Sequence, residues 1–266
     1  MRTAVVTGSA SGIGAATVAV LERRGDRVIG VDLRDADVVA DLGTREGRTE
    51  AVAAVIEASG GTVGAVVACA GVGSFQADQA TIVRVNYFGT VEMIDGLRPL
   101  LARSAAPAAC AIASVAMLFE QDGALTEACL AGDEDEAVAR TSPGGRTAYA
   151  SSKRAVARWV RRTAPTVAWA GAGICLNAIA PGVVRTPMTA IELDDPELRD
   201  DLLGQIAQPM TAVGQPEDVA SVLAWLVGPE NRFVTGQVLY VDGGFEARTC
   251  GDEVGRLMEA AEGGGA

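Results

Sequence analysis

A glycine-rich turn near the start of this chain limits the folds that it can adopt. The segment from Thr7 to Gly14 reads Thr-Gly-Ser-Ala-Ser-Gly-Ile-Gly and follows the apolar run from Thr3 to Val6. Glycines at such a turn let a pyrophosphate approach the N-terminus of the next helix, where free N–H groups favour anions. Many glycine-rich segments are ordinary turns, but this one joins a strand pattern to a helical pattern. We therefore predict a dinucleotide-binding turn that consists of Gly8, Ser11, Gly12, Ile13 and Gly14.

The rest of the chain alternates short β-branched runs with longer segments of helical period, which is typical of βαβ units. We predict strands at Thr3 to Val6, Arg27 to Asp32, Val63 to Cys69, Ala108 to Ala113, Gly173 to Ala178 and Gln237 to Val241. We predict helices at Gly12 to Arg24, Arg45 to Ala58, Gln76 to Arg103, Thr147 to Ala170 and Pro216 to Val227. The expected architecture is a single-domain α/β Rossmann fold. Its doubly wound parallel sheet would carry helices on both faces and bind ligands outside the carboxyl ends of the strands.

Two segments depart from a minimal fold of this kind. The connection from Met117 to Gly145 is far longer than usual, and its apolar residues at helical spacing predict two short inserted helices that cap the sheet edge or the pocket rim. The segment from Thr186 to Met210 is expected to form a mobile lid over the substrate. We therefore divide the chain into a domain at 1–247, with the insertion at 117–145 and the lid at 187–210, and a partly helical tail at 248–266.

Composition argues against several other classes of protein. There are 34 acidic and 22 basic residues, and the net charge of −12 disfavours nucleic acid and anionic membranes as partners. No stretch reaches the roughly 20 apolar residues that cross a membrane. The five cysteines are far apart, and the chain has no histidine to complete a metal site, so we expect a reduced, cytoplasmic protein without a metal. The absence of histidine also removes Ser-His-Asp and Cys-His mechanisms.

Proton transfer must therefore come from other groups, and Tyr149 and Lys153 are the best candidates. The two residues are separated by one helical turn and would project from one face. A neighbouring ammonium stabilises a phenolate and lowers the pKa of the tyrosine, which suits proton exchange with a carbonyl oxygen. This spacing also occurs by chance in surface pairs. Lys153 is, however, the only lysine in the chain, and arginine does not replace a compact ammonium at such a site.

Asp32 bears on the choice of dinucleotide. It ends the second predicted strand, about 20 residues after the glycine turn, where a carboxylate accepts hydrogen bonds from the adenosine ribose. A 2′-phosphate would meet like charge there, and Ser9, Ala10 and Ser11 offer no basic side chain. Arg34 lies close enough to leave NADP open, and a solvated turn aspartate is the other interpretation. The sequence favours NAD.

Further motifs follow in a fixed order along nearly the whole chain. They are Asp41-Leu42, Ala70-Gly71, Asn86, Ser114, Tyr149 with Lys153, Asn177 before Pro181-Gly182, Thr186 and Asp242-Gly243-Gly244. With the glycine turn and Asp32, these motifs resemble those of the short-chain dehydrogenase/reductase family. The segments Ser-Gly-Ile-Gly-Ala-Ala-Thr and Val-Asn-Tyr-Phe-Gly, and the long segment before Tyr149, are most similar to its bacterial 3α-hydroxysteroid dehydrogenase/carbonyl reductase branch.

The resemblance implies a role for each matched residue. Tyr149 would be the general acid/base, Lys153 would bind the nicotinamide ribose and lower the tyrosine pKa, and Ser114 would hydrogen-bond the substrate oxygen. Asn86 would hold a helix irregularity and a water for proton relay. The residues implied at the cofactor, besides the glycine turn and the Tyr-Lys pair, are Asp32, Leu33, Asp41, Leu42, Ala70, Gly71, Pro181, Gly182, Val183, Val184 and Thr186. A strand-end cap is the alternative for Ser114, and a polar helix-interior residue is the alternative for Asn86.

The resemblance has two departures. The usual asparagine before the Ala-Gly pair is Cys69 here, so a side-chain amide is absent, which catalysis should survive. Relatives also form homodimers or homotetramers through the helices predicted at 76–103 and 147–170, and the insertion is a possible obstacle to that interface. We expect a homo-oligomer whose interface the sequence does not specify.

The expected reaction is reversible hydride transfer between NAD(H) and a hydrophobic secondary alcohol or ketone, such as a steroid. An apolar, flexible pocket would suit this substrate, and ordinary core or loop packing is the alternative for each of its predicted residues. The predicted pocket residues are Val115, Met117, Phe119, Met188, Ile191 and Met210. A dinucleotide-binding sensor without turnover and a ketoacyl-thioester reductase are the competing functions. Consumption of NADH with a panel of ketones would separate the sensor, and a comparison of NADH with NADPH would separate the thioester reductase.

Overall fold

The computed structural model describes residues 1–142, 145, 147–210 and 213–252. These residues form a seven-stranded, fully parallel sheet with the order β3-β2-β1-β4-β5-β6-β7. The strands are β1 (Thr3–Thr7), β2 (Arg27–Asp32), β3 (Val38–Val39), β4 (Ala65–Ala68), β5 (Ala108–Ile112), β6 (Cys175–Pro181) and β7 (Val238–Val241). The order reverses between β1 and β4, and a crevice at the carboxyl ends is expected at such a point. The predicted doubly wound α/β fold is confirmed.

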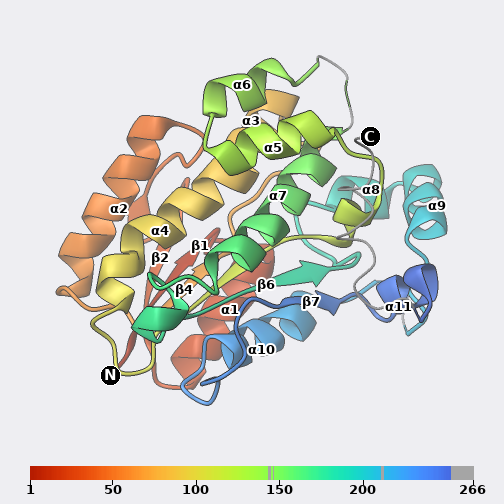
Figure 1. Ribbon diagram of the computed structural model, residues 1–266. Coiled ribbons are helices and arrows are strands. Elements are labelled where there is room, and N and C mark those ends of the chain that lie inside the picture. Colours follow the sequence, from red (N-terminus) through yellow and green to blue (C-terminus); the bar gives the residue numbers. More distant parts are fainter. Residues whose placement is uncertain (143–144, 146, 211–212, 253–266) are drawn as a thin grey trace.

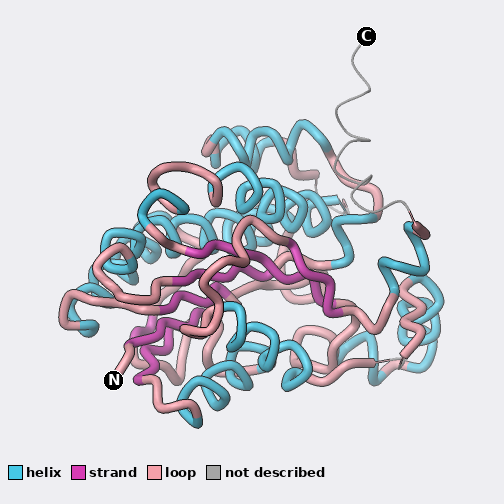
Figure 2. The backbone as a smooth tube through the Cα atoms, turned by 60° about the horizontal axis from the view of Figure 1, so that its bottom comes forward, coloured by secondary structure: helices cyan, strands magenta, loops and turns pink. Residues whose placement is uncertain are grey.

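Alternate residues of the central strands supply two separate apolar layers. In β1, Val5 packs into a cluster with residues of α2 (Arg45–Ser59), α4 (Thr90–Leu101) and α7 (Thr147–Thr163). Its neighbours Ala4 and Val6 pack on the other face with residues of α1 (Gly12–Arg23) and α10 (Pro216–Leu226). Figures 1 and 2 show the sheet between these two layers of helices. Because both faces are covered, these strands are nearly continuously apolar, as expected for buried parallel sheets.

Two predicted helix boundaries are wrong, the strand predicted at Gly173 to Ala178 is shifted to Cys175–Pro181, and one strand was missed. The helix predicted to reach Ala170 ends at Thr163, because Pro165 disfavours helical geometry at Ala164. A single helix was predicted from Gln76, but α3 (Gln79–Val83) begins after Asp78, whose carboxylate accepts a hydrogen bond from the N–H of Thr81. The missed strand, β3, has only two residues, which is too short to give a periodic signal.

A π-helical segment, Arg84–Gly89, joins α3 to α4 and places Asn86 inside the molecule. The extra residue in a π turn breaks the regular hydrogen-bond ladder, and such segments recur at functional sites. The irregularity expected at Asn86 is therefore present in the structure. The side chain of Asn86 forms hydrogen bonds with the backbone of Val72, in the loop after β4, and so lies close to the carboxyl end of the sheet.

The long connection before α7 contains a 3₁₀ turn, Val115–Leu118, followed by α5 (Gly123–Ala131) and α6 (Glu134–Ala139). The two helices were expected at the sheet edge or the pocket rim. Instead, α5 packs against α7, and α6 packs against α3 and the π-helical segment, on the outer side of the helical layer (Figure 1). The N–H of Asp122 donates to the hydroxyl of Ser151 in α7, which fixes the start of α5. The insertion therefore covers helices rather than strands.

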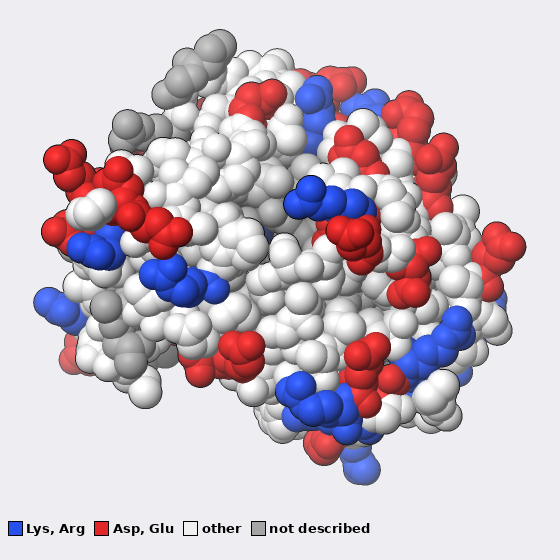
Figure 3. Space-filling model, turned by 180° about the vertical axis from the view of Figure 1, so that it is seen from behind, with Lys and Arg blue, Asp and Glu red and all other residues white. Residues whose placement is uncertain are grey.

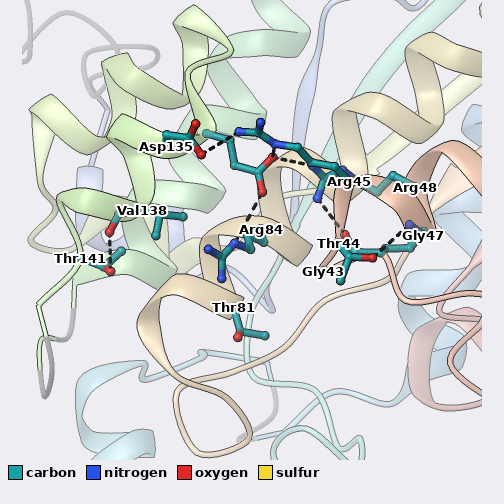
Figure 4. A network of polar contacts seen from close by, with 12 residues as sticks. Gly43, Thr44, Arg45, Gly47, Arg48, Thr81, Arg84, Asp135, Val138 and Thr141 are labelled. Carbon is teal, nitrogen blue, oxygen red and sulfur yellow. Dashed lines mark hydrogen bonds and ion pairs between the residues drawn. The ribbon is translucent and has the colours of Figure 1, made fainter.

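A charged cluster fastens α6 to the main body of the protein (Figure 4). Glu134 is 6% exposed and accepts hydrogen bonds from Arg45 (2.9 Å) and Arg48 (2.5 Å) of α2, while Arg84 lies 3.5 Å away. Arg48 is fully buried and also pairs with Glu92 of α4. A buried charge is costly unless it is paired, so this arginine depends on its two carboxylates. The cluster joins the insertion to two core helices.

The remaining elements lie towards the C-terminus of the chain. They are α8 (Ala190–Asp194) and α9 (Pro196–Gln205), which lie in the segment predicted as a lid, the 3₁₀ turn Ala170–Ala172, and α11 (Phe245–Cys250). The helical pattern predicted around Val254, Leu257 and Met258 lies outside the described residues. No helix in the described ranges is long and apolar enough to cross a membrane.

Candidate active site

The glycine turn brings the N-terminus of α1 to the carboxyl end of β1. Gly8 and Gly12 have φ values of +66° and +54°, which side chains rarely adopt. A Cβ at Gly14 would overlap the carbonyl oxygen of Gly8, and a Cβ at Gly8 would lie 2.8 Å from the backbone nitrogen of Ala70. The turn is therefore tight because no side chain fits at these glycines. It leaves backbone N–H groups at the start of the helix, where anions bind well.

Asp32 lies at the end of β2 beside this turn. Its two carboxylate oxygens accept hydrogen bonds from the backbone N–H groups of Ala10 (2.9 Å) and Leu33 (2.7 Å). These bonds hold the carboxylate across from the glycine turn. Arg34 lines the same cavity as Asp32, so both a negative and a positive side chain are available there.

Ser114, Tyr149 and Lys153 meet where β5 ends against α7. Ser114 follows β5 and caps the 3₁₀ turn, since its hydroxyl accepts from the N–H of Ala116 (3.1 Å). The Lys153 Nζ lies 5.8 Å from the centre of the Tyr149 ring and donates to the carbonyl oxygen of Ile112 (2.9 Å). Local spacing explains the Tyr-Lys pair, whereas the parallel sheet brings Ser114 to it.

The titration of these groups is dominated by burial. Burial raises the pKa of Tyr149, while a hydrogen bond with Ser114 partly lowers it and the negative charge of Glu192 raises it further. The net shift is opposite to the one expected from Lys153, because the effect of burying the phenol exceeds that of the hydrogen bond that lowers its pKa. Burial lowers the pKa of Lys153 to about 8. At neutral pH the phenol is therefore a proton donor and the ammonium remains largely charged.

Asn86 lies close to Lys153 but does not line the cavities at this end of the sheet. Its side-chain oxygen accepts from the N–H of Val72 (2.8 Å), and its nitrogen donates to the carbonyl of Val72 (3.0 Å). A Cβ at Gly71 would lie 3.1 Å from the Asn86 oxygen and 3.5 Å from the Lys153 nitrogen. The asparagine thus fixes the loop after β4 against the lysine.

The residues predicted for the dinucleotide gather around one cavity of about 550 Å³. It extends from the glycine turn past Asp32 to the Tyr-Lys pair. Of the cofactor residues implied by the sequence, Val183 alone lines the neighbouring cavity instead. Those that line the 550 Å³ cavity are Gly8, Ser11, Gly12, Ile13, Gly14, Asp32, Leu33, Asp41, Leu42, Ala70, Gly71, Tyr149, Lys153, Pro181, Gly182, Val184 and Thr186.

A second cavity of about 930 Å³ adjoins the first, and Ser114 and Tyr149 line both. Three of the predicted pocket residues, Val115, Phe119 and Met188, line it. The other three do not. Met117 is buried in the core cluster because its turn directs it inward, Ile191 is half exposed, and Met210 is 82% exposed, with its N–H bound to the carbonyl of Gly243.

Several polar residues of this region were missed by sequence reasoning, and two of them, Gln76 and Glu192, bear on the lid and the larger cavity. The Gln76 side chain accepts from the N–H of Gly73 (3.1 Å) and donates to the carbonyl of Met188 (2.7 Å), so it links the loop after β4 to the lid. Glu192 lines the larger cavity from α8. The only signal for Glu192 was its place between the apolar residues Ile191 and Leu193, and no local pattern marked Gln76.

The surface charges agree with the overall composition. On the face shown in Figure 3, acidic and basic side chains are interspersed around a broad uncharged area. This face does not present a continuous basic patch among the described residues, as a nucleic-acid surface would.

Comparison with known proteins agrees with this architecture. The model of a family described as enoyl-(acyl carrier protein) reductase matches residues 136–246. The 3-alpha-hydroxysteroid dehydrogenase/carbonyl reductase of Comamonas testosteroni is 40% identical over 254 residues, which cover 93% of this chain and 97% of that protein. The 2-(R)-hydroxypropyl-CoM dehydrogenase of Xanthobacter autotrophicus is 31% identical over 265 residues, which cover 92% of this chain and 99% of that protein.

A solved structure is similar over the same range. The 3-alpha-hydroxysteroid dehydrogenase from Pseudomonas sp. B-0831, solved in complex with NADH, has a TM-score of 0.88 and 42% identity, covering 94% of this chain and 99% of that one. The parallel fold and the Ser-Tyr-Lys group at its carboxyl end define the class of protein as an oxidoreductase with a Rossmann-like domain. The chain belongs to the short-chain dehydrogenase/reductase family.

Proposed function

We propose that this protein is an NAD(H)-dependent enzyme that interconverts a hydrophobic secondary alcohol and its ketone, with steroid-like compounds as substrates. The observation that carries the proposal is that Ser114 and Tyr149 line both cavities. A proton donor at that junction is within reach of a substrate on one side and of a dinucleotide on the other. The names of the Comamonas and Pseudomonas relatives support the same class of substrate.

The residues of the smaller cavity fit a dinucleotide. The space beside Gly8 and Gly14 is one that side chains would fill, so a phosphate can approach the backbone. The N-terminus of α1 would hold the pyrophosphate, and Asp32 would accept hydrogen bonds from the adenosine ribose. Asp41, Leu42, Ala70 and Gly71 would frame the adenosine side, and Thr186 would contact the nicotinamide end.

Side chains of the protein would transfer the proton to and from the substrate oxygen. When bound, NADH supplies a hydride to the carbonyl carbon, and NAD accepts one from the carbinol carbon. In reduction, Tyr149 donates its phenolic proton to the substrate oxygen, and in oxidation its phenolate takes the hydroxyl proton back. Ser114 holds the substrate oxygen in place, and Lys153 stabilises the phenolate and binds the ribose. Asn86 keeps the loop after β4 in position and would hold a water for proton relay.

NAD is favoured over NADP by the place of Asp32. Its carboxylate is held by two backbone N–H groups at the ribose end of the cavity and would repel a 2′-phosphate. Arg34 is the one feature that favours NADP. The Pseudomonas relative was solved with NADH, which supports the first choice.

The test is consumption of NADH and NADPH by the full chain with a panel of steroid and other cyclic ketones. We expect turnover of apolar cyclic ketones with NADH. Binding of NADH without turnover of any ketone would indicate a sensor, and a preference for NADPH with acyl thioesters would indicate a ketoacyl reductase. Either result would contradict the proposal.

We also infer that a homo-oligomer of this protein does not use the outer surfaces of α3 and α7. The chain's own α5 and α6 cover them, and the Glu134 cluster fastens α6 in place. Light scattering should give a dimer or tetramer. A crystallographic or cross-linked dimer that joins α4 and α7 of one copy to the same helices of the next would contradict the inference.

A further inference from the structure

The larger cavity combines apolar walls with charged side chains of one sign. Among the described residues that line it, the charged ones are Asp78, Glu192 and Asp201, and none is a lysine or an arginine. Asp78 caps α3 through the N–H of Thr81, and Asp201 accepts a hydrogen bond from Gln205 (3.0 Å). Because the hydrogen bonds from Thr81 hold the pKa of Asp78 below its usual range, this residue stays ionised. The cavity therefore presents negative charge to whatever enters.

Glu192 is the carboxylate that the structure relates most directly to the reacting group. It lines the cavity from α8, as Tyr149 does from α7, and its negative charge raises the pKa of the phenol. Its side chain is partly buried, and burial raises its pKa. No lysine or arginine among the described residues pairs with it. The arginine at the base of the lid, Arg185, pairs with Asp194 instead (3.1 Å).

An unpaired carboxylate in a partly dehydrated pocket discriminates strongly between charges. The interaction of two charges a few Å apart is several times stronger near a protein surface than in bulk water. A second anion placed there would also lose hydration without gaining a cation. A hydroxyl, amide or ammonium group, by contrast, can donate a hydrogen bond to the carboxylate. Glu192 is therefore placed to select substrates by charge as well as by shape.

We propose that Glu192 restricts the substrates to ketones and secondary alcohols that are neutral or cationic near the reacting carbon, and excludes those that carry a carboxylate there. The inference rests on the proposed function, because it assigns Tyr149 and the larger cavity to the substrate. It adds the class of compound that the site accepts, namely cyclic ketones whose substituent close to the carbonyl is apolar, a hydrogen-bond donor or a cation. Asp201 reinforces the same selection from α9.

The test uses two ketones of equal size that differ by one charge, 4-oxocyclohexanecarboxamide and 4-oxocyclohexanecarboxylate. Each is reduced by the full chain with NADH at neutral pH, and kcat/KM is measured. We expect a ratio of kcat/KM, amide to carboxylate, of about tenfold or more. Equal values for the two ketones would overturn the inference while leaving the proposed function intact. No turnover of these or of any apolar cyclic ketone would overturn the proposed function, and the inference with it.

Substitution then assigns the effect to one residue. Glu192→Gln keeps the shape of the side chain and removes its charge, so the amide-to-carboxylate ratio should fall several-fold. Glu197→Gln is the matched control, since Glu197 is an exposed residue of α9 outside the cavity lining, and the same loss of charge there should leave the ratio at its original value. Thermal unfolding checks that both variants fold. A folded Glu192→Gln variant with the original ratio, or an equal change in both variants, would show that Glu192 does not select the substrate.

Discussion

The ammonium of Lys153 donates a 2.9 Å hydrogen bond to the backbone carbonyl of Ile112, the last residue of β5. This bond ties the single lysine of the chain to the sheet rather than to the phenol one helical turn away. The side chain is only 3% exposed, so its charge is held in place by one carbonyl and little water. Its titration should therefore differ from that of a surface lysine.

The pKa of Lys153 should be about 8, compared with an ordinary value of 10.5, because burial disfavours the charged form. Protein labelled with ¹³C at the ε carbon of lysine should give one resonance, whose shift reports the titration. Between pH 8 and 10.5 the folded chain has lost a proton that the unfolded chain keeps. The contribution of Lys153 to stability should thus rise with pH across this window. A midpoint near 10.5 would mean that the ammonium is hydrated.

Asp32→Asn should change the preference between dinucleotides. It removes the negative charge at the ribose end of the cavity but keeps a hydrogen-bond acceptor there, so the ratio of kcat/KM for NADPH to that for NADH should rise about tenfold or more. Asp35→Asn is the control, because it removes a nearby charge that does not line the cavity. If both variants gave the ratio of the unmodified protein, Asp32 would not face the ribose.

Glu134→Gln should destabilise the protein, because it takes away one of the two carboxylates that pair with the fully buried Arg48. Breaking such a buried pair lowers the free energy of unfolding by about 3 kcal/mol. The adjacent Asp135→Asn removes an exposed partner of Arg45 and should have little effect. Urea unfolding of both variants measures the difference. Similar losses of stability in the two would contradict the anchoring role of Glu134.

The sequence predicts the fold well where the signal is local. The alternation of strands and helices and the strand-turn-helix at Gly8 to Gly14 both reflect contacts between near neighbours, and the structure has them. Strand β3 forms because Val38 and Val39 pair with the end of β2. No short sequence pattern predicts this pairing. The sequence predicts a parallel sheet but no order of strands, because that order depends on how the crossover connections pack rather than on any single segment.

In the candidate site too, some residues could be predicted from the sequence and others depend on tertiary contacts. The residues predicted for the dinucleotide follow strand ends in sequence, so the parallel sheet gathers them around one cavity. The substrate side depends on how the lid and the turn after β5 fold back. Met117 and Met210 have the same chemical character as Met188, yet only Met188 lines the larger cavity. Glu192 was missed for the same reason, since its position depends on tertiary contacts of the lid.

The central claim is that Tyr149 exchanges the proton with the substrate, and a pair of Tyr→Phe variants tests it most directly. Tyr149→Phe removes one hydroxyl at the junction of the cavities, and Tyr240→Phe removes one in β7, outside both. The measurement is kcat/KM for a cyclic ketone with NADH, together with NADH affinity by fluorescence. We predict a loss of about 100- to 10,000-fold for Tyr149→Phe with NADH binding retained, and near-normal activity for Tyr240→Phe. A Tyr149→Phe variant that kept its activity would contradict the account.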